Sequence, residues 1–180
     1  MSEQPEQGET SWECLSPFGP MRLWGWEGRL SHVELGSAHA GRPGRPCPPG
    51  LERFAILLRD YLRGRDMCIE AWELETDDMG GLRREVCLEL LKVGFGQLVS
   101  YGELARRVGR PGAARAVGQA VGANPFPIFV PCHRVVCRDG RPGGFSAGRE
   151  WKARLLRHEG WGAWRDSGPS GGPLRRVEQA

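Results

Sequence analysis

Two short helical patterns joined by a turn constrain the fold of this chain most strongly. Residues 100–109 (SYGELARRVG) begin with a serine that can cap a helix, and a glutamate three residues later completes a capping-box pattern. Residues 113–124 (AARAVGQAVGAN) place apolar side chains at helical spacing. The RPGA turn between them predicts a helix-turn-helix, although ordinary helix bundles also contain such a pair.

Helical patterns continue on both sides of this pair. Residues 82–94 repeat apolar side chains every three to four positions, and residues 149–160 form an amphipathic pattern that stops at a glycine. Between them, residues 127–144 predict an apolar segment, a bend at Pro131-Cys132-His133 and then a hairpin that turns at Asp139-Gly140. We therefore expect a mostly helical C-terminal domain over residues 82–160.

The first part of the chain has strand patterns instead. Residues 21–36 alternate apolar and polar side chains around a turn at Glu27-Gly28, which predicts two strands, and residues 67–74 (MCIEAWEL) predict a third. Residues 51–64 form a helical pattern that follows two prolines and ends at a glycine. The expected fold class is α+β, with a small N-terminal domain of a three-stranded sheet and a helix over residues 13–76.

Polar and glycine-rich segments separate these parts. Residues 77–81 (DDMGG) predict a linker between the two domains, residues 1–12 are expected to be disordered, and residues 161–180 are expected to form a flexible tail of low complexity.

Charge is divided unequally between the two domains. The net charge is −6 over residues 1–81, +8 over residues 82–160 and +1 over residues 161–180. A cationic domain beside an anionic one predicts a polyanionic partner, and an exposed arginine face solvated by water is the alternative. No apolar run approaches the roughly 20 residues of a membrane span, and the N-terminus lacks a secretion signal. We therefore expect no membrane partner and a cytoplasmic protein, or a nuclear one in a eukaryote.

The segment PCHRVV at residues 131–136 carries the strongest chemical signal. A thiol becomes a good nucleophile only as a thiolate, and the histidine after Cys132 could accept its proton. Neighbours on a straight strand point to opposite faces, so the pair requires a bend, which Pro131 favours. The alternatives are a purely structural pair and a metal site formed by Cys132, His133 and Cys137, which lacks a fourth ligand at a recognised spacing.

The six cysteines form no CxxC pair, and no metal site is predicted from them. In the N-terminal domain a structural zinc could draw on Cys14, His32, His39 and Cys47, but their spacing matches no known zinc pattern.

PCHRVV, preceded by NPFPIFV and AARAVGQAVGAN, resembles the signature of the O6-methylguanine-DNA methyltransferases, also called methylated-DNA–protein-cysteine methyltransferases. GQLVSYGELA and RLLRHEG are also similar to that family, so the resemblance runs through residues 82–160, whereas residues 13–75 fit the family only in outline. The resemblance implies DNA repair by direct reversal, in which an alkyl group moves irreversibly from O6 of guanine to the protein's own cysteine. It also implies one turnover per molecule and no cofactor. The partner would be double-stranded DNA, bound in the minor groove by a monomer with little sequence preference, and O4-alkylthymine is a second candidate lesion.

The resemblance also implies roles for single residues. Cys132 would accept the alkyl group, His133 would be its base through a water molecule, and Glu159 would orient the histidine. Asn124 would be the hinge between the recognition helix and the corner at the cysteine, and its side chain can satisfy backbone groups of a turn.

The predicted DNA contacts lie on the helix-turn-helix. Tyr101 would crowd the phosphate of the target nucleotide, and Arg115 would enter the base stack in place of the rotated guanine. The residues alone favour a solvent-exposed phosphate contact for Arg115. The small residues Ala114, Gly118 and Ala123 allow close approach in a narrow groove, or simply good helix packing.

The glycine-rich residues 143–148 would cover the guanine. The predicted substrate-pocket residues are Val135, Phe145, Ser146 and Ala147. Phe145 replaces a tyrosine that is common in the family, and Gly122 replaces a common basic residue. Both departures bear on rate, substrate range and affinity rather than on the type of reaction. Two functions compete with alkyl transfer: a non-enzymatic DNA binder that senses damage, and a thiol hydrolase that turns over.

Overall fold

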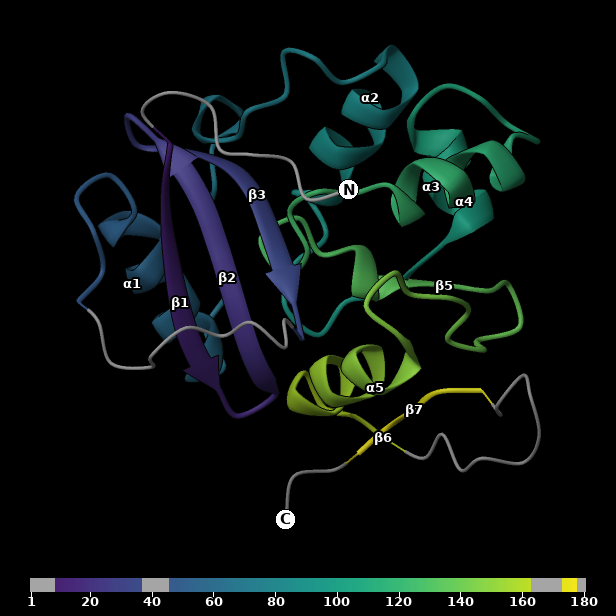
Figure 1. The fold of residues 1–180 in the computed structure, drawn as a ribbon. Coiled ribbons are helices and arrows are strands. Elements are labelled where there is room, and N and C mark those ends of the chain that lie inside the picture. The colour runs from purple at the N-terminus through teal and green to yellow at the C-terminus, as the bar shows by residue number, and fades with distance from the viewer. Residues whose placement is uncertain (1–8, 37–45, 163–172, 178–180) are drawn as a thin grey trace. The chain divides into compact units, whose positions relative to one another are not determined.

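The computed structural model describes residues 9–36, 46–162 and 173–177. The chain divides into two compact units, an N-terminal unit (Met1–Asp78) and a C-terminal unit (Met79–Ala180), and the division falls inside the predicted linker. Figure 1 shows the strands of the first unit in purple and the helices of the second in teal and green.

The N-terminal unit contains a three-stranded antiparallel sheet in the order β1 (Thr10–Ser16), β2 (Gly19–Trp26) and β3 (Arg29–Leu35). The predicted turn between β2 and β3 is present, with positive φ at both Glu27 and Gly28, as a two-residue hairpin requires. Helix α1 (Glu52–Leu62) packs on this sheet, and an edge-on contact joins Tyr61 of the helix to Phe18. The buried residues of this core are Met21, Leu23, Leu30, Val33, Leu51, Phe54, Leu58 and Tyr61.

The third strand was predicted in the wrong place. It lies at Thr10–Ser16, so the expectation that residues 1–12 are disordered is wrong for residues 10–12, while residues 1–8 lie outside the described part. The segment 67–74 instead ends in a 3₁₀ helix, η1 (Ala71–Glu73), with a capping box between Glu70 and Glu73. The Glu73 side chain is fully buried and paired with Arg53, which favours the helical turn over an extended strand.

The C-terminal unit is mostly helical, as predicted. Its helices are α2 (Gly81–Leu90), α3 (Tyr101–Arg107), α4 (Ala114–Gly122), the 3₁₀ helix η2 (Cys132–Arg134) and α5 (Arg149–His158). Helices α2, α3 and α4 pack against one another, and α5 packs against η2. The predicted cap of α3 is present, since Glu103 N donates to Ser100 Oγ at 3.1 Å, but the Glu103 carboxylate pairs with Arg106 and Arg107 instead of closing a capping box.

Short strands complete the C-terminal unit. β5 (Val135–Val136) pairs in parallel with β4 (Val99–Ser100). The chain then turns back at Asp139-Gly140 as predicted, since Gly140 N donates to Cys137 O at 3.0 Å and Cys137 N donates to Arg141 O at 2.8 Å. β6 (Trp161–Gly162) pairs with β7 (Arg175–Arg176), so these parts of the predicted flexible tail are ordered, while residues 163–172 and 178–180 lie outside the described part. Among the described residues, no helix is both long enough and apolar enough to cross a membrane.

Candidate active site

The predicted corner begins at Asn124, just after α4 ends. The buried Asn124 side chain donates from Nδ2 to Val130 O at 2.9 Å and accepts at Oδ1 from Phe126 N at 3.0 Å. Val130 N also donates back to Phe126 O at 2.8 Å, which closes the loop. One amide side chain therefore fixes the path from α4 to the cysteine.

Ile128, inside this loop, has a φ of +77° although it is β-branched and fully buried. A left-handed conformation costs a non-glycine residue about 1–2 kcal/mol, and such strain persists only where the surrounding contacts hold it. Asn124 and the Phe126–Val130 hydrogen bond supply those contacts here. The loop thus holds Pro131 and the following helical turn in a fixed place.

Cys132 is the first residue of η2, and its side chain is only 2% exposed. Burial raises the pKa of the thiol above its usual range, and this effect exceeds the opposing ones. A hydrogen bond from Asn124, the charge of Lys152 and backbone N–H groups favour the thiolate. Cys132 therefore rests as a thiol. Its surroundings can stabilise the thiolate once a base has removed the proton.

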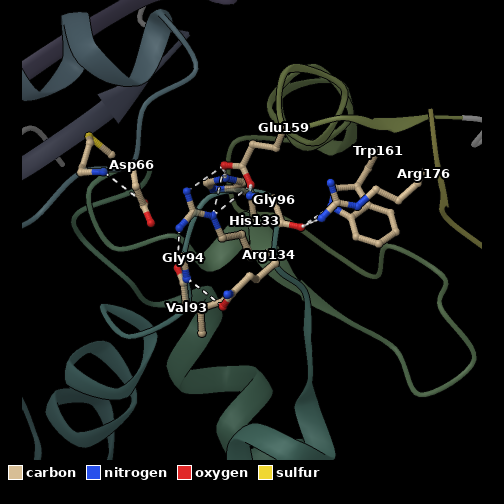
Figure 2. Close-up of polar contacts among 11 residues, drawn as sticks. Asp66, Val93, Gly94, Gly96, His133, Arg134, Glu159, Trp161 and Arg176 are labelled. Carbon is tan, nitrogen blue, oxygen red and sulfur yellow. Dashed lines mark hydrogen bonds and ion pairs between the residues drawn. The ribbon is translucent and has the colours of Figure 1, made fainter. Parts of the chain in front are cut away.

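His133, the next residue, is fully buried, and its Nε2 lies 2.7 Å from Glu159 Oε1 (Figure 2). Burial lowers the pKa of His133 despite the attraction of Glu159, so the ring is neutral at pH 7. Burial would raise the pKa of Glu159, but His133 and Arg134 outweigh it and lower that pKa to about 2. An ionised carboxylate can only accept, so Nε2 of the neutral histidine donates to Glu159, and Nδ1 is the basic nitrogen.

Arg134 completes this buried network and was not predicted as a site residue. Its Nε lies 3.0 Å from Glu159 Oε2 and its Nη2 lies 2.9 Å from Glu159 Oε1, while Nη1 donates to Val93 O. Glu159 follows α5, and Gly96 N donates to its Oε2 at 3.0 Å. The structure therefore brings His133, Arg134 and Glu159 together, whereas the sequence indicated only the first and the last.

Lys152 is the second residue that sequence reasoning missed. It is 1% exposed on α5, and its Nζ donates to Val135 O at 2.6 Å and to Gly144 O at 3.2 Å. Burial lowers its pKa to about 8, against the opposing electrostatic effect of Cys132 and Cys137. A lysine three residues before Leu155 lies on the apolar face of an amphipathic helix, and that pattern was the available signal.

The predicted pocket residues have different surroundings. Val135 is fully buried in β5, Phe145 and Ala147 are half-buried, and Ser146 is exposed. Phe145 O accepts from Gly148 N at 3.0 Å, which forms a turn ahead of α5. Through its bonds to Val135 O and Gly144 O, the Lys152 ammonium connects the strand that follows η2 to this loop.

Of the predicted DNA-contacting residues, Ala114, Arg115 and Gly118 lie on α4, Ala123 is its C-cap, and Tyr101 begins α3. Val117, Ala120 and Val121 are buried, whereas Arg115, Gly122 and Ala123 are exposed and Ala114 and Gly118 are half-exposed. A Cβ on Gly118 would lie 3.7 Å from the Tyr101 ring, and a Cβ on Gly143 would lie 3.1 Å from the Tyr101 hydroxyl. Tyr101 thus lies between α4 and the loop of the predicted pocket.

In the described part of the chain, no group of three or more His, Cys, Asp or Glu residues is arranged to hold a metal ion. Of the zinc ligands considered from the sequence, His39 lies outside the described residues, and Cys14 and Cys47 lie close enough for their charges to interact.

A protein-family model and several named relatives match this chain. Residues 81–161 match the family model described as 6-O-methylguanine DNA methyltransferase, DNA binding domain. The human methylated-DNA–protein-cysteine methyltransferase is 54% identical over 160 residues, which cover 81% of this chain and 77% of the human protein. The chain belongs to the methylated-DNA–protein-cysteine methyltransferase family.

Other members of this methyltransferase family agree with the assignment and with the α+β fold class. The structure of Mycobacterium tuberculosis OGT in complex with DNA is 33% identical with a TM-score of 0.70, covering 83% of this chain and 92% of that one. The methyltransferase of Salmonella typhimurium is 49% identical over 106 residues, which are 58% of this chain and 60% of that protein. This last match thus spans less than two thirds of the relative's length. Within the family-model match of residues 81–161 lie Asn124, Cys132, His133 and Glu159.

Proposed function

We propose that this chain repairs DNA by transferring the alkyl group of O6-alkylguanine, and of O4-alkylthymine as a second candidate lesion, to its own Cys132. Residues 82–160 would form the DNA-binding alkyltransferase domain. The observation that carries the proposal is the buried His133–Glu159 contact of 2.7 Å directly after a buried thiol, in a chain of this family. No cofactor takes part in the proposed reaction.

In the proposed reaction His133 Nδ1 takes the proton of the Cys132 thiol through a water molecule, while Glu159 stabilises the resulting imidazolium. The thiolate attacks the alkyl carbon, a C–S bond forms, and the bond from that carbon to O6 breaks with its electron pair left on the guanine. The His133 imidazolium gives its proton back through water, the guanine ring takes up one proton, and the repaired guanine stays in the DNA. In this proposal the Ser146 hydroxyl donates to O6 as charge develops on that oxygen. The thioether has no easy hydrolytic route back to a thiol, so each molecule would react once.

The target atom is buried in a duplex, so the nucleotide must leave the base stack. We propose that α4 enters the minor groove by its small residues Ala114, Gly118 and Ala123, that Tyr101 crowds the target phosphate and that Arg115 fills the gap. Support comes from the exposed side of α4, from the +8 charge of residues 82–160 and from the DNA complex of the M. tuberculosis relative. Such binding would involve one copy of the chain and show little sequence preference. It would take place in the compartment that holds the DNA.

The reaction is tested with a duplex that carries a radiolabelled O6-methylguanine. Alkyl transfer predicts label on the protein up to one methyl group per molecule and no further release. A thiol hydrolase would release label to solution over many cycles, and a damage sensor would bind the duplex without moving the label. Either result would overturn the proposal.

Arg115 distinguishes base replacement from simple phosphate contact. We expect Arg115→Ala to slow transfer from duplex by about tenfold or more, because opening the stack costs a few kcal/mol. The rate with free O6-benzylguanine should stay unchanged, since a free base needs no extrusion. Single-turnover rates with both substrates measure this.

Arg115→Lys is the matched control, because it keeps the charge and removes the planar guanidinium. If Arg115 stacks in the helix, the lysine variant should be slow like the alanine variant. A lysine variant as fast as wild type on duplex would show that Arg115 acts only through phosphate attraction.

A further inference from the structure

Gly96 contacts the active-site carboxylate from outside the family motif that carries the cysteine. Its N–H donates to Glu159 Oε2 at 3.0 Å, on the oxygen that does not contact His133. Gly96 has a φ of +70°, and a Cβ there would lie 3.2 Å from Glu159 O. A side chain at this position would be strained by the backbone conformation and crowded against the end of α5.

The carbonyl of the same glycine is held from the opposite side. It accepts from Trp161 Nε1 at 3.0 Å and from Arg176 Nη2 at 2.9 Å, and the Arg176 guanidinium lies 5.0 Å from the centre of the Trp161 ring. Figure 2 shows these two side chains meeting the Gly96 carbonyl while Glu159 lies on the other side of the glycine. We call this pair the Trp161–Arg176 clasp.

Backbone pairing keeps the clasp in place. Trp161 and Arg176 are direct partners in the β6–β7 ladder, and Val177 N donates to Gly160 O at 2.9 Å. Earlier in the same segment, Leu174 N donates to Gly140 O at 2.9 Å. Residues 173–177 are therefore anchored at both ends of the short strand that carries Arg176.

We propose that Trp161 and Arg176 are positioning residues for the active site. They hold the Gly96 loop so that its N–H stays on Glu159 Oε2, which acts together with Arg134 to fix the rotation of the carboxylate and with it the orientation of the His133 ring. Without the clasp, the loop keeps its internal bonds, Gln97 N to Gly94 O and Gly94 N to Gln97 Oε1, but loses its two outer donors. Neither clasp residue contacts the alkyl group or the thiol in this proposal.

The test uses the full chain with Trp161→Phe and Arg176→Met, singly and combined. Phenylalanine keeps the ring but removes the N–H, and methionine keeps the apolar stem but removes the guanidinium. Arg175→Met is the matched control, because Arg175 precedes Arg176 on β7, is exposed and carries the same charge. Circular dichroism checks that each variant is folded, and if the double variant is not, the exposed Arg176→Met alone carries the test.

The first readout is the proton on His133 Nε2, which the hydrogen bond to Glu159 should shift downfield and protect from exchange in the nuclear magnetic resonance spectrum. We expect this signal to broaden or vanish in the clasp variants and to persist in Arg175→Met. A role confined to stabilising the tail would leave the signal unchanged. An unchanged signal in the double variant would overturn the proposal.

The second readout is the single-turnover rate of alkyl transfer, and this arm rests on the proposed function. The double variant should be slower by about tenfold at saturating duplex, because a misoriented base loses much of its advantage. A rate equal to wild type would also count against the clasp. If the wild-type protein transfers no alkyl group, the proposed function fails, whereas the His133 signal still decides whether the clasp positions Glu159.

Discussion

Cys132→Ala is expected to abolish transfer of label from methylated duplex to protein, a loss of at least about a thousandfold in rate. The side chain removed is the proposed acceptor, so the sulfur that would form the C–S bond is gone. The variant should still bind duplex, because the exposed side of α4 is unchanged. Mass spectrometry of the intact protein after exposure to the duplex, with a parallel binding titration, measures both effects.

Cys137→Ala is the matched control, since this half-buried thiol lies only five residues away and is also near Lys152. It should still gain one methyl group per molecule. The proposed acceptor would be wrong if the Cys132 variant gained a methyl group or if the label of the wild-type protein mapped to Cys137.

Glu159→Gln should produce the largest loss of stability among single changes in the site. The carboxylate is 2% exposed and neutralises the equally buried Arg134, so the amide leaves that guanidinium without its counter-charge. Removing one partner of a buried ion pair costs about 3–5 kcal/mol of unfolding free energy. Urea unfolding at pH 7 measures the difference, and the transfer rate should fall as well because His133 loses its anionic partner.

The control is Glu150→Gln on the same helix, whose carboxylate is exposed and lies 3.4 Å from Arg154 Nη2. An exposed pair contributes no more than about 1 kcal/mol, so this variant should unfold almost as wild type does. Equal losses in the two variants would contradict the assignment of Glu159 to a buried network.

The pKa of the same carboxylate predicts how the difference in unfolding free energy between wild type and Glu159→Gln depends on pH. The pKa of Glu159 is lowered from 4.5 to about 2 by folding, so its contribution is complete above the unfolded pKa and is lost as pH falls from about 4.5 towards 2. Wild type and Glu159→Gln should therefore converge in unfolding free energy over that range. A gap that stays constant down to pH 2 would mean that the carboxylate is not ionised in the folded protein.

Local patterns in the sequence were sufficient for features that depend on near neighbours. The capping serine at Ser100, the turn at Glu27-Gly28, the helical periods and the motif around Cys132 all involve residues within a few positions of one another. These features depend on side-chain spacing and on backbone preferences, so they can be predicted without knowing which distant segments are in contact.

Features that depend on distant contacts were wrong or missing. Residues 67–74 have the composition of a strand, but the burial of Glu73 against Arg53, twenty positions earlier, favours a helical turn. Arg134 and Lys152 were not predicted to be buried, yet each is buried because carboxylate or carbonyl oxygens from other segments surround it.

The sequence by itself determined the family and the helix pair, and it predicted Cys132 and His133 as candidate site residues. Only the tertiary structure decided which charges lie inside and how Gly96, Trp161 and Arg176 gather around Glu159. The physical reason is that burying a charge is unfavourable unless its partners are assembled around it, and the partners of the buried Glu159 carboxylate lie up to 63 positions away in the chain.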